Sequence, residues 1–172
     1  MKTQSGIKMK LLAILLLLMI TNLLPAQNEK GTREKWKLDK NKYLTGGLVL
    51  VSGTAKGFNE TLQFHWKSFK KAFPDANPNW FNPAISWRNK YEDGNPNNGA
   101  NFPLSTSVLI MFTDQYHLNN FISRGALTTA LVIKIGEKKK RFGYYVKDFL
   151  FYTLCYQVGW SASYIPFKYK KV

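Results

Sequence analysis

The chain has 172 residues, which is a typical length for one domain, and its 25 Lys and Arg against 10 Asp and Glu give a net charge of +15 at neutral pH. Cys155 is the single cysteine, which excludes an intramolecular disulfide and a cysteine-based metal site within one chain. The positive charge suits an anionic membrane surface or nucleic acid.

The first 26 residues have the layout of a secretory signal peptide. Basic residues precede an apolar run over residues 11–24, and Pro25 and Ala26 follow it. The run is shorter than the ~20 residues that span a bilayer comfortably. The sequence therefore predicts a signal peptide over residues 1–26 and a mature chain over residues 27–172; the alternative is an uncleaved anchor helix. We expect an exported protein of the inner membrane or periplasm, which has no nucleic acid as partner.

Two segments open the mature chain, the first apolar and the second polar. Residues 43–65 contain the apolar run 48–51 among several glycines. Residues 67–103 are rich in Pro and Asn, which favour turns and interrupt long regular elements, so we expect a loop insert with at most one short helix. The aromatic side chains of the insert are expected to pack against the domain or a partner: Trp80, Phe81, Trp87 and Tyr91.

Two further apolar segments complete the chain. Residues 103–135 begin with Pro103, a helix start, and form one long helix or two joined near Gly125. Residues 144–167 are apolar and aromatic and end at Pro166. Each long segment has about 20 residues or more, enough to cross a bilayer as a helix. The sequence predicts an all-α fold, a small bundle of three to four long helices with a Pro-, Asn- and Trp-rich loop insert. These helices span a membrane or, alternatively, form a compact domain.

Three acidic residues and both histidines lie in or at the end of these apolar segments. They are Glu60, His65, Asp114, His117 and Asp148. Burial of a charge is costly unless the charge is paired or coordinated, and inside a membrane such residues mark functional sites. The five are candidate ligands for a divalent metal through oxygen and imidazole. They are also candidates for an acid–base pair in which a carboxylate orients a histidine.

Helical spacing places Glu60 on a face with small residues. Gly46, Gly53, Gly57 and Glu60 fall on one stripe of a helix, and glycines there let another helix approach closely. Glu60 is therefore expected to point into a helix contact, with Gln63 beside it.

The other acidic residues share faces too. Asp114 and His117 are three residues apart, and Asp148 shares a face with Tyr152. We expect the three helices to bring these polar groups together at one place. Structural roles are the alternative: a hydrogen bond between Asp114 and His117, and a favourable position of Asp148 near a helix start.

The sequence also resembles known groups of proteins. Residues 57–65, 86–91 and 112–118 are similar to a group of short exported or membrane proteins of Bacteroidota-type bacteria, a resemblance that implies no activity. More distantly, the Asp-His pair on one helix and the Glu on a Gly-containing helix resemble VanZ-like and YfiM-like envelope proteins. In this chain Glu60 precedes the pair, which is a departure from that order.

Three functions follow from these patterns. In the first, an envelope membrane protein binds a polar ligand, a lipid headgroup or a metal through Glu60, Gln63, Asp148 and Tyr152. In the second, a membrane hydrolase or transferase acts on a lipid-linked or phosphate substrate, with His117 as base and Asp114 orienting it. In the third, a structural subunit docks onto an envelope protein through its insert, at Trp80, Trp87 and Tyr91. The patterns identify no cofactor and leave enzyme activity open.

Overall fold

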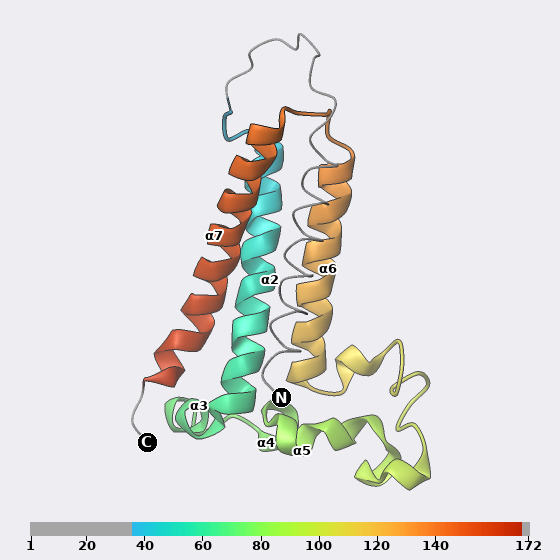
Figure 1. The fold of residues 1–172 in the computed structure, drawn as a ribbon. Helices are drawn as coiled ribbons and strands as arrows, with labels where there is room; N and C mark the ends of the chain where they lie inside the picture. The colour runs from blue at the N-terminus through green and yellow to red at the C-terminus, as the bar shows by residue number, and fades with distance from the viewer. Residues whose placement is uncertain (1–35, 170–172) are drawn as a thin grey trace, which may run out of the picture. The chain divides into compact units, whose positions relative to one another are not determined.

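A computed structural model describes residues 36–169 (Figure 1). The predicted signal peptide, and with it the export prediction, lies outside these residues. The described part contains six α-helices: α2 (Lys40–Phe64), α3 (Trp66–Ala72), α4 (Pro78–Phe81), α5 (Pro83–Ser86), α6 (Gln115–Ile135) and α7 (Phe142–Lys168). It also contains four 3₁₀ helices: η1 (Trp87–Lys90), η2 (Glu92–Gly94), η3 (Pro96–Asn98) and η4 (Ile110–Phe112). Over residues 36–169 there is no strand, only an isolated bridge between Tyr91 and Ala100. The all-α prediction is confirmed, with three long and three short α-helices rather than three to four long ones.

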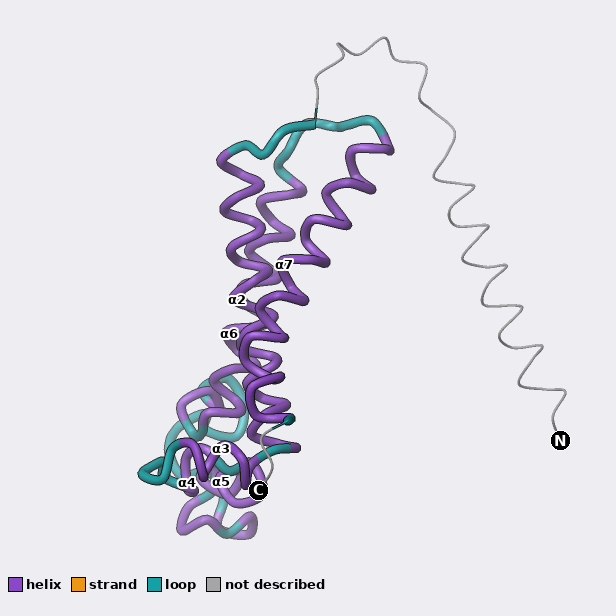
Figure 2. Tube along the Cα trace, turned by 90° about the vertical axis from the view of Figure 1, so that its left-hand side faces the viewer, coloured by secondary structure: helices purple, strands orange, loops and turns teal. Residues whose placement is uncertain are grey.

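The helix α2 lies between α6 and α7 and packs against both (Figure 1). The chain direction of α6 is opposite to that of α2, whereas α7 runs in the same direction as α2. The short helices α3, α4 and α5 gather at one end of the three long helices (Figure 2). At the other end, the turn between α6 and α7 lies beside the start of α2 (Figure 1).

Local sequence sets where the long helices begin and end. The Asp39 side chain accepts a hydrogen bond from the Lys42 amide at the start of α2, and Asp114 does the same for His117 at the start of α6. The predicted helix start at Pro103 is wrong. Leu104 has φ of 63°, in the left-handed region, so no helix continues through it. From Gln115 onward α6 is one continuous helix, which settles the choice between one helix and two.

Small and polar side chains, rather than large apolar ones, fill the contacts of α2. The Ser52 and Ser123 hydroxyls are hydrogen bonded at 2.8 Å across the α2–α6 contact. In the same contact Asn59 accepts from Asn119 Nδ2 at 2.9 Å. On the α7 side, Thr61 Oγ1 donates to the carbonyl oxygen of Ser163 at 2.8 Å. Many large apolar side chains of the three long helices are exposed as a result.

Glycines let α2 and α7 approach closely, as their spacing predicted. A Cβ atom added to Gly53 would overlap the carbonyl oxygen of Tyr156, and one added to Gly57 would overlap Trp160. From the other side, a Cβ atom at Gly159 would overlap the Leu50 carbonyl oxygen. Backbone therefore meets backbone along this contact, and no larger residue fits at these three positions.

The prediction of membrane-spanning helices is wrong. Within residues 36–169, no helix combines the length and the apolar character that crossing a membrane requires. The physical reason is composition: glycines, hydroxyl residues and charges such as Lys56 in α2 and Arg124 in α6 lower the hydropathy of helices that are long enough.

Candidate functional site

An open apolar pocket of about 640 Å³ lies at the end of α2 and α7, beside the short helices. We call it the aromatic pocket. Its lining residues are Phe58, Phe69, Ala72, Phe73, Pro74, Asp75, Ala76, Phe81, Ser163 and Phe167. They come from α2, α3, the turn after α3, α4 and α7. Since these elements are far apart in the sequence, the pocket exists only in the folded chain.

Phe69 is the centre of the pocket wall. It is 4% exposed, and its ring centroid lies 5.5 Å from that of Phe58 and 5.7 Å from that of Phe167. The rings of Phe73 and Phe81 are also close, at 5.0 and 5.8 Å. Tilted and edge contacts of this kind are the preferred arrangement of aromatic rings. They hold the wall in place and join α3 to α2, α4 and α7.

The polar groups around the pocket are few and mostly satisfied. The Ser163 hydroxyl donates to the Thr54 carbonyl oxygen at 2.8 Å. The Lys70 ammonium donates to the carbonyl oxygens of Ala76, at 2.8 Å, and of Pro74, and so holds the turn that forms one wall. Asp75 is the single ionisable residue in the lining. A ligand would therefore meet mainly carbon.

Sequence reasoning missed this pocket, because it assigned residues 67–103 to a loop insert. A signal was present: Trp66, Phe69 and Phe73 are spaced by three and four residues, which is one face of a helix. Trp66 and Phe69 do lie in α3, and Phe73 follows it directly. The partners on α2 and α7 could not be foreseen, because no sequence pattern links positions about 100 residues apart.

Asp114 and His117 form a tight pair at the start of α6. Asp114 is fully buried, and one of its carboxylate oxygens lies 2.7 Å from Nδ1 of His117, whose side chain is 20% exposed. The other oxygen accepts from the His117 amide at 2.8 Å. When Nδ1 carries the proton, this contact fixes the imidazole with Nε2 as the basic nitrogen. The predicted pair is therefore real in geometry, and it also caps the helix.

Tyr116, the neighbour of His117 in α6, lines a second cavity. Its volume is about 270 Å³, and its lining is Leu62, Gln63, Asn82, Pro83, Ala84 and Tyr116. Gln63, predicted as a ligand-binding residue, thus lines a cavity. The Tyr116 ring meets the His117 ring edge-on, with centroids 5.8 Å apart, so one residue separates the histidine from this second cavity.

Three hydroxyl residues that lie near the pair in the sequence already have hydrogen-bond partners. Ser105 is buried and donates to the Lys90 carbonyl oxygen at 2.7 Å. Thr113 donates to the Ile110 carbonyl oxygen at 2.7 Å, and Ser123 is bonded to Ser52 on α2. A reaction at His117 that uses none of these three hydroxyls would take water as the nucleophile.

Glu60 of α2 and His65, which directly follows α2, both contact α7. Glu60 accepts a hydrogen bond from the Trp160 indole at 2.9 Å and lies 3.7 Å from the Lys56 ammonium. Nε2 of His65 is 3.0 Å from the Tyr164 hydroxyl. The prediction that Glu60 points into a helix contact is confirmed, and its partner there is an indole rather than a second acid or a histidine.

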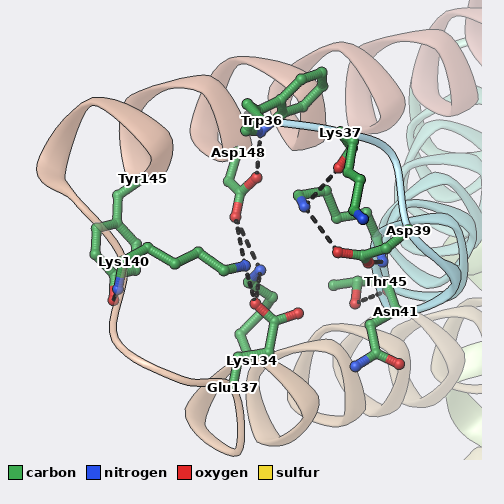
Figure 3. Close-up of polar contacts among 11 residues, drawn as sticks. Trp36, Lys37, Asp39, Asn41, Thr45, Lys134, Glu137, Lys140, Tyr145 and Asp148 are labelled. Atoms are coloured by element: carbon green, nitrogen blue, oxygen red, sulfur yellow. Dashed lines mark hydrogen bonds and ion pairs between the residues drawn. The ribbon is translucent and has the colours of Figure 1, made fainter. Parts of the chain in front are cut away.

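Charged side chains cluster at the opposite end of the long helices (Figure 3). We call this group the end cluster. It consists of Asp39, Lys42, Lys134, Glu137, Lys140 and Asp148, with Trp36 beside it. The residues come from the start of α2, the end of α6, the α6–α7 turn and the start of α7. Three acids face three lysines, so the cluster is electrically balanced at neutral pH.

Asp148 is the centre of the end cluster. It is 3% exposed, accepts from the Lys134 ammonium at 2.9 Å and accepts from the Trp36 indole at 2.8 Å (Figure 3). Burial alone would raise the pKa of Asp148, but the hydrogen bonds from Lys134 and Trp36 outweigh it and hold that pKa below its usual value. In the same way, Lys134 and Lys140 hold the pKa of Glu137 below its usual value against the effect of burial. Both acids are therefore ionised in the folded protein at neutral pH.

Tyr152, predicted to share a face with Asp148, lies beside the end cluster. The Lys134 ammonium is 5.5 Å from the centroid of its ring. Its hydroxyl is buried without a hydrogen-bond partner, and burial raises its pKa. Glu137 Oε1 is the other unpartnered oxygen of this region.

The structure thus separates the residues that were expected to meet. Asp148 and Tyr152 lie at one end of the long helices, whereas Glu60, Asp114 and His117 lie toward the other end, in two different helix contacts. In the described part of the chain, no three His, Cys, Asp or Glu side chains come together in a group that could hold a metal ion. The metal site predicted from the five residues therefore has no geometric basis there.

The predicted docking residues of the insert differ in their surroundings. The Trp80 indole donates to Gln115 at 3.0 Å and so joins the insert to α6. Trp87 is 37% exposed, stacks edge-on with Tyr91 at 6.2 Å and lies 5.6 Å from the Arg88 guanidinium. Docking of a partner on this surface stays a prediction.

Comparison with known proteins adds no relative. The chain matches no protein-family model, no curated protein and no solved structure at a significant level. The resemblance to VanZ-like and YfiM-like proteins stays a prediction, and the function has to be argued from the geometry of the chain itself.

Proposed function

We propose that this protein binds an apolar ligand, an acyl chain or an aromatic molecule, in the aromatic pocket. The observation that carries the proposal is the pocket itself. Its volume of about 640 Å³ lies within the ~300–1,000 Å³ typical of sites for small molecules. Its lining is dominated by aromatic side chains with few polar groups, which is the usual composition of such sites.

The chemistry of the lining selects the class of ligand. The Ser163 hydroxyl donates its proton to the Thr54 carbonyl oxygen, so it cannot donate to a ligand without losing that bond. The Lys70 ammonium donates to the Pro74 and Ala76 carbonyl oxygens and is not among the residues that line the pocket. Loss of such a bond costs about 1–3 kcal/mol. Apolar contact with the phenylalanine rings is therefore the main source of affinity, and the ligand need carry no charge.

A fluorescent probe tests the proposal. N-phenyl-1-naphthylamine is neutral and apolar, and its emission rises when it leaves water. We expect saturable binding to the wild type and at least a tenfold weaker affinity for Ala72→Phe, because a phenyl ring at position 72 fills the pocket. Ala84→Phe is the matched control, since Ala84 lines only the second cavity. The proposal fails if the probe does not bind saturably, or if Ala72→Phe binds it as well as Ala84→Phe does.

A second function is favoured by the Asp114–His117 pair. A histidine held by a buried carboxylate and close to a cavity is the arrangement of a general base, which contributes roughly 10²–10⁴-fold to a rate. Here it would activate water against an ester or phosphoester. Hydrolysis of p-nitrophenyl butyrate and p-nitrophenyl phosphate by wild type and His117→Ala tests this. Equal rates for the two proteins would exclude it.

A further inference from the structure

We propose that Asn98 is a site of spontaneous deamidation in the folded protein. The reaction needs only water, and it converts the side-chain amide of Asn98 into a carboxylate. This inference does not depend on the aromatic pocket. It rests on the residue that follows Asn98, on the surroundings of the two groups that react, and on the contrast with a neighbouring Asp–Gly pair.

Gly99 makes Asn98 susceptible. The two residues form the single Asn–Gly pair of the 172-residue chain. Deamidation begins when the main-chain nitrogen of the next residue attacks the side-chain amide carbon, and glycine has no side chain to hinder this attack. The fold itself requires the glycine, because Gly99 has φ of 86° and ψ of −157°, a conformation that is essentially restricted to glycine. The structure therefore keeps the most reactive neighbour next to Asn98.

Both reacting groups are accessible. Asn98 and Gly99 are exposed. The Asn98 main-chain N–H donates to the Asn95 carbonyl oxygen at 3.0 Å, but within residues 36–169 the Asn98 side chain has no hydrogen-bond partner. The Gly99 N–H likewise donates to no acceptor in that part of the chain. A Cβ atom built on Gly99 would have nothing within 4 Å, so there is room for the peptide unit to turn. The attack therefore breaks no hydrogen bond of the fold.

An Asp–Gly pair in the same loop provides the contrast. Asp93 precedes Gly94, and the same kind of attack at this pair would isomerise the aspartate. The Gly94 N–H, however, donates to the Tyr91 carbonyl oxygen at 3.0 Å. Its nitrogen has to leave that bond before it can react, and a lost hydrogen bond destabilises the reacting conformation. Asn98 is therefore expected to react faster than Asp93.

The chemistry proceeds through a cyclic imide. The Gly99 nitrogen forms a bond to Cγ of Asn98, and the bond from Cγ to the side-chain nitrogen breaks. This nitrogen leaves as ammonia together with the proton of the Gly99 N–H. Water then opens the ring at one of its two carbonyl carbons. Opening at Cγ gives an aspartate, whereas opening at the main-chain carbonyl carbon gives an isoaspartate, in which the chain runs through Cγ.

The products change the insert. Each adds a carboxylate and so removes one unit from the net charge of +15. Isoaspartate also lengthens the main chain by one carbon atom directly before Gly99, whose carbonyl oxygen accepts from the Glu92 N–H at 3.2 Å. This bond belongs to the bridge between Tyr91 and Ala100. Isoaspartate therefore loosens the bridge that holds Tyr91, one of the predicted docking residues.

Hydrogen exchange tests this effect on the bridge. The isoaspartate form is separated from the unmodified protein by ion-exchange chromatography. We expect the Glu92 amide to exchange faster in the isoaspartate form, because its acceptor on Gly99 has moved. Equal exchange of this amide in the two forms would overturn the effect on the bridge.

Peptide mass spectrometry of the full chain, incubated at about pH 8 and 37 °C, tests the deamidation itself. We expect modification at Asn98 at least tenfold faster than at any other asparagine, with aspartate and isoaspartate both present, and faster than isomerisation of Asp93. Asn98→Gln is the matched control and should remove the acidic form that isoelectric focusing detects. The same chain unfolded in guanidinium chloride gives the rate without the fold. A rate at Asn98 in the folded protein below one tenth of the unfolded rate would show that the fold protects the site, and a rate no higher than that of Asn97 would equally overturn the proposal.

Discussion

Replacement of Gly53 by alanine tests the close approach of α2 and α7. The added methyl group would overlap the Tyr156 carbonyl oxygen and lie 3.1 Å from the Trp160 amide nitrogen. Both atoms belong to the backbone of a packed helix, so they cannot move aside as a flexible side chain could. Gly47→Ala is the control on the same helix, because a methyl group there meets nothing within 4 Å.

The two substitutions should change stability in opposite directions. Alanine in place of glycine inside a helix favours folding by about 0.8–1 kcal/mol, which is the whole expected effect at Gly47. At Gly53 the added methyl group brings the same gain in helix propensity, but overpacking destabilises the folded state by ~1–3 kcal/mol or more. Because the methyl group meets rigid backbone, we expect the destabilisation to lie at the upper end of this range. We expect the variants to differ by roughly 2–4 kcal/mol. For a chain of this size that is a Tm difference of about 4–16 °C.

Thermal and urea unfolding followed by far-UV circular dichroism measure this difference. The m-value should be unchanged, so that the shift in midpoint reports stability. Equal midpoints for Gly53→Ala and Gly47→Ala would refute the close approach, and so would stabilisation by both.

Three further substitutions follow from the described contacts. Asp148→Asn leaves the Lys134 ammonium without one of its carboxylates and should lower the free energy of unfolding by about 2–4 kcal/mol at pH 7. Because the pKa of Asp148 is held below its usual value, the stability that its carboxylate contributes is present at pH values above the usual pKa of an aspartate and is lost as the pH falls. The urea midpoints of wild type and Asp148→Asn should therefore converge below about pH 4. A difference between the two midpoints that does not change with pH would contradict the ion pair. Phe69→Ala should lower the free energy of unfolding by about 3–5 kcal/mol, because the ring is buried among other rings. The same urea unfolding measures this loss, and a loss under about 1 kcal/mol would show that the rings do not hold α3 in place. Asp114→Ala should lower the free energy of unfolding by ~1–2 kcal/mol, because the helix α6 loses its N-terminal cap. Asp114→Asn can still cap the helix and should lower it by less. The reverse order would show that the contact with His117, and not the cap, stabilises the start of α6.

Much of the helical layout could be predicted from sequence. The apolar segments 43–65 and 144–167 correspond to α2 and α7 within three residues at each end. Glycine spacing correctly predicted a close helix contact on the side of Glu60. These successes share a cause: helix periodicity and glycine spacing are local, and local patterns survive in the folded chain.

The expected convergence of Glu60, Asp114 and Asp148 failed for a geometric reason. Helical spacing predicts the face of the helix on which a residue lies. It does not predict how two packed helices are positioned relative to one another along their axes. Asp148 follows the α6–α7 turn by only a few residues, which holds it near that turn, whereas Asp114 begins α6 at the other end. The apolar content of the segments also predicted helix contacts that are made by large apolar side chains. These side chains lie mainly on the outside, and serine, threonine and asparagine line the helix contacts.

The central position of α2 has a consequence for how the chain folds during synthesis. Its bonds to α6 join residues 57–71 apart, and its bonds to α7 join residues 100–109 apart. A ribosome adds about 5–20 residues each second, so α2 waits on the order of 5–20 s for the last of its partners. During the first part of that interval neither partner of α2 exists, and after α6 has been made α7 is still missing. Contacts of such long range also form slowly. Slower elongation through residues 142–168 would lengthen the time during which α2 lacks α7. A peptide of residues 142–168 added to the translation reaction would shorten that time.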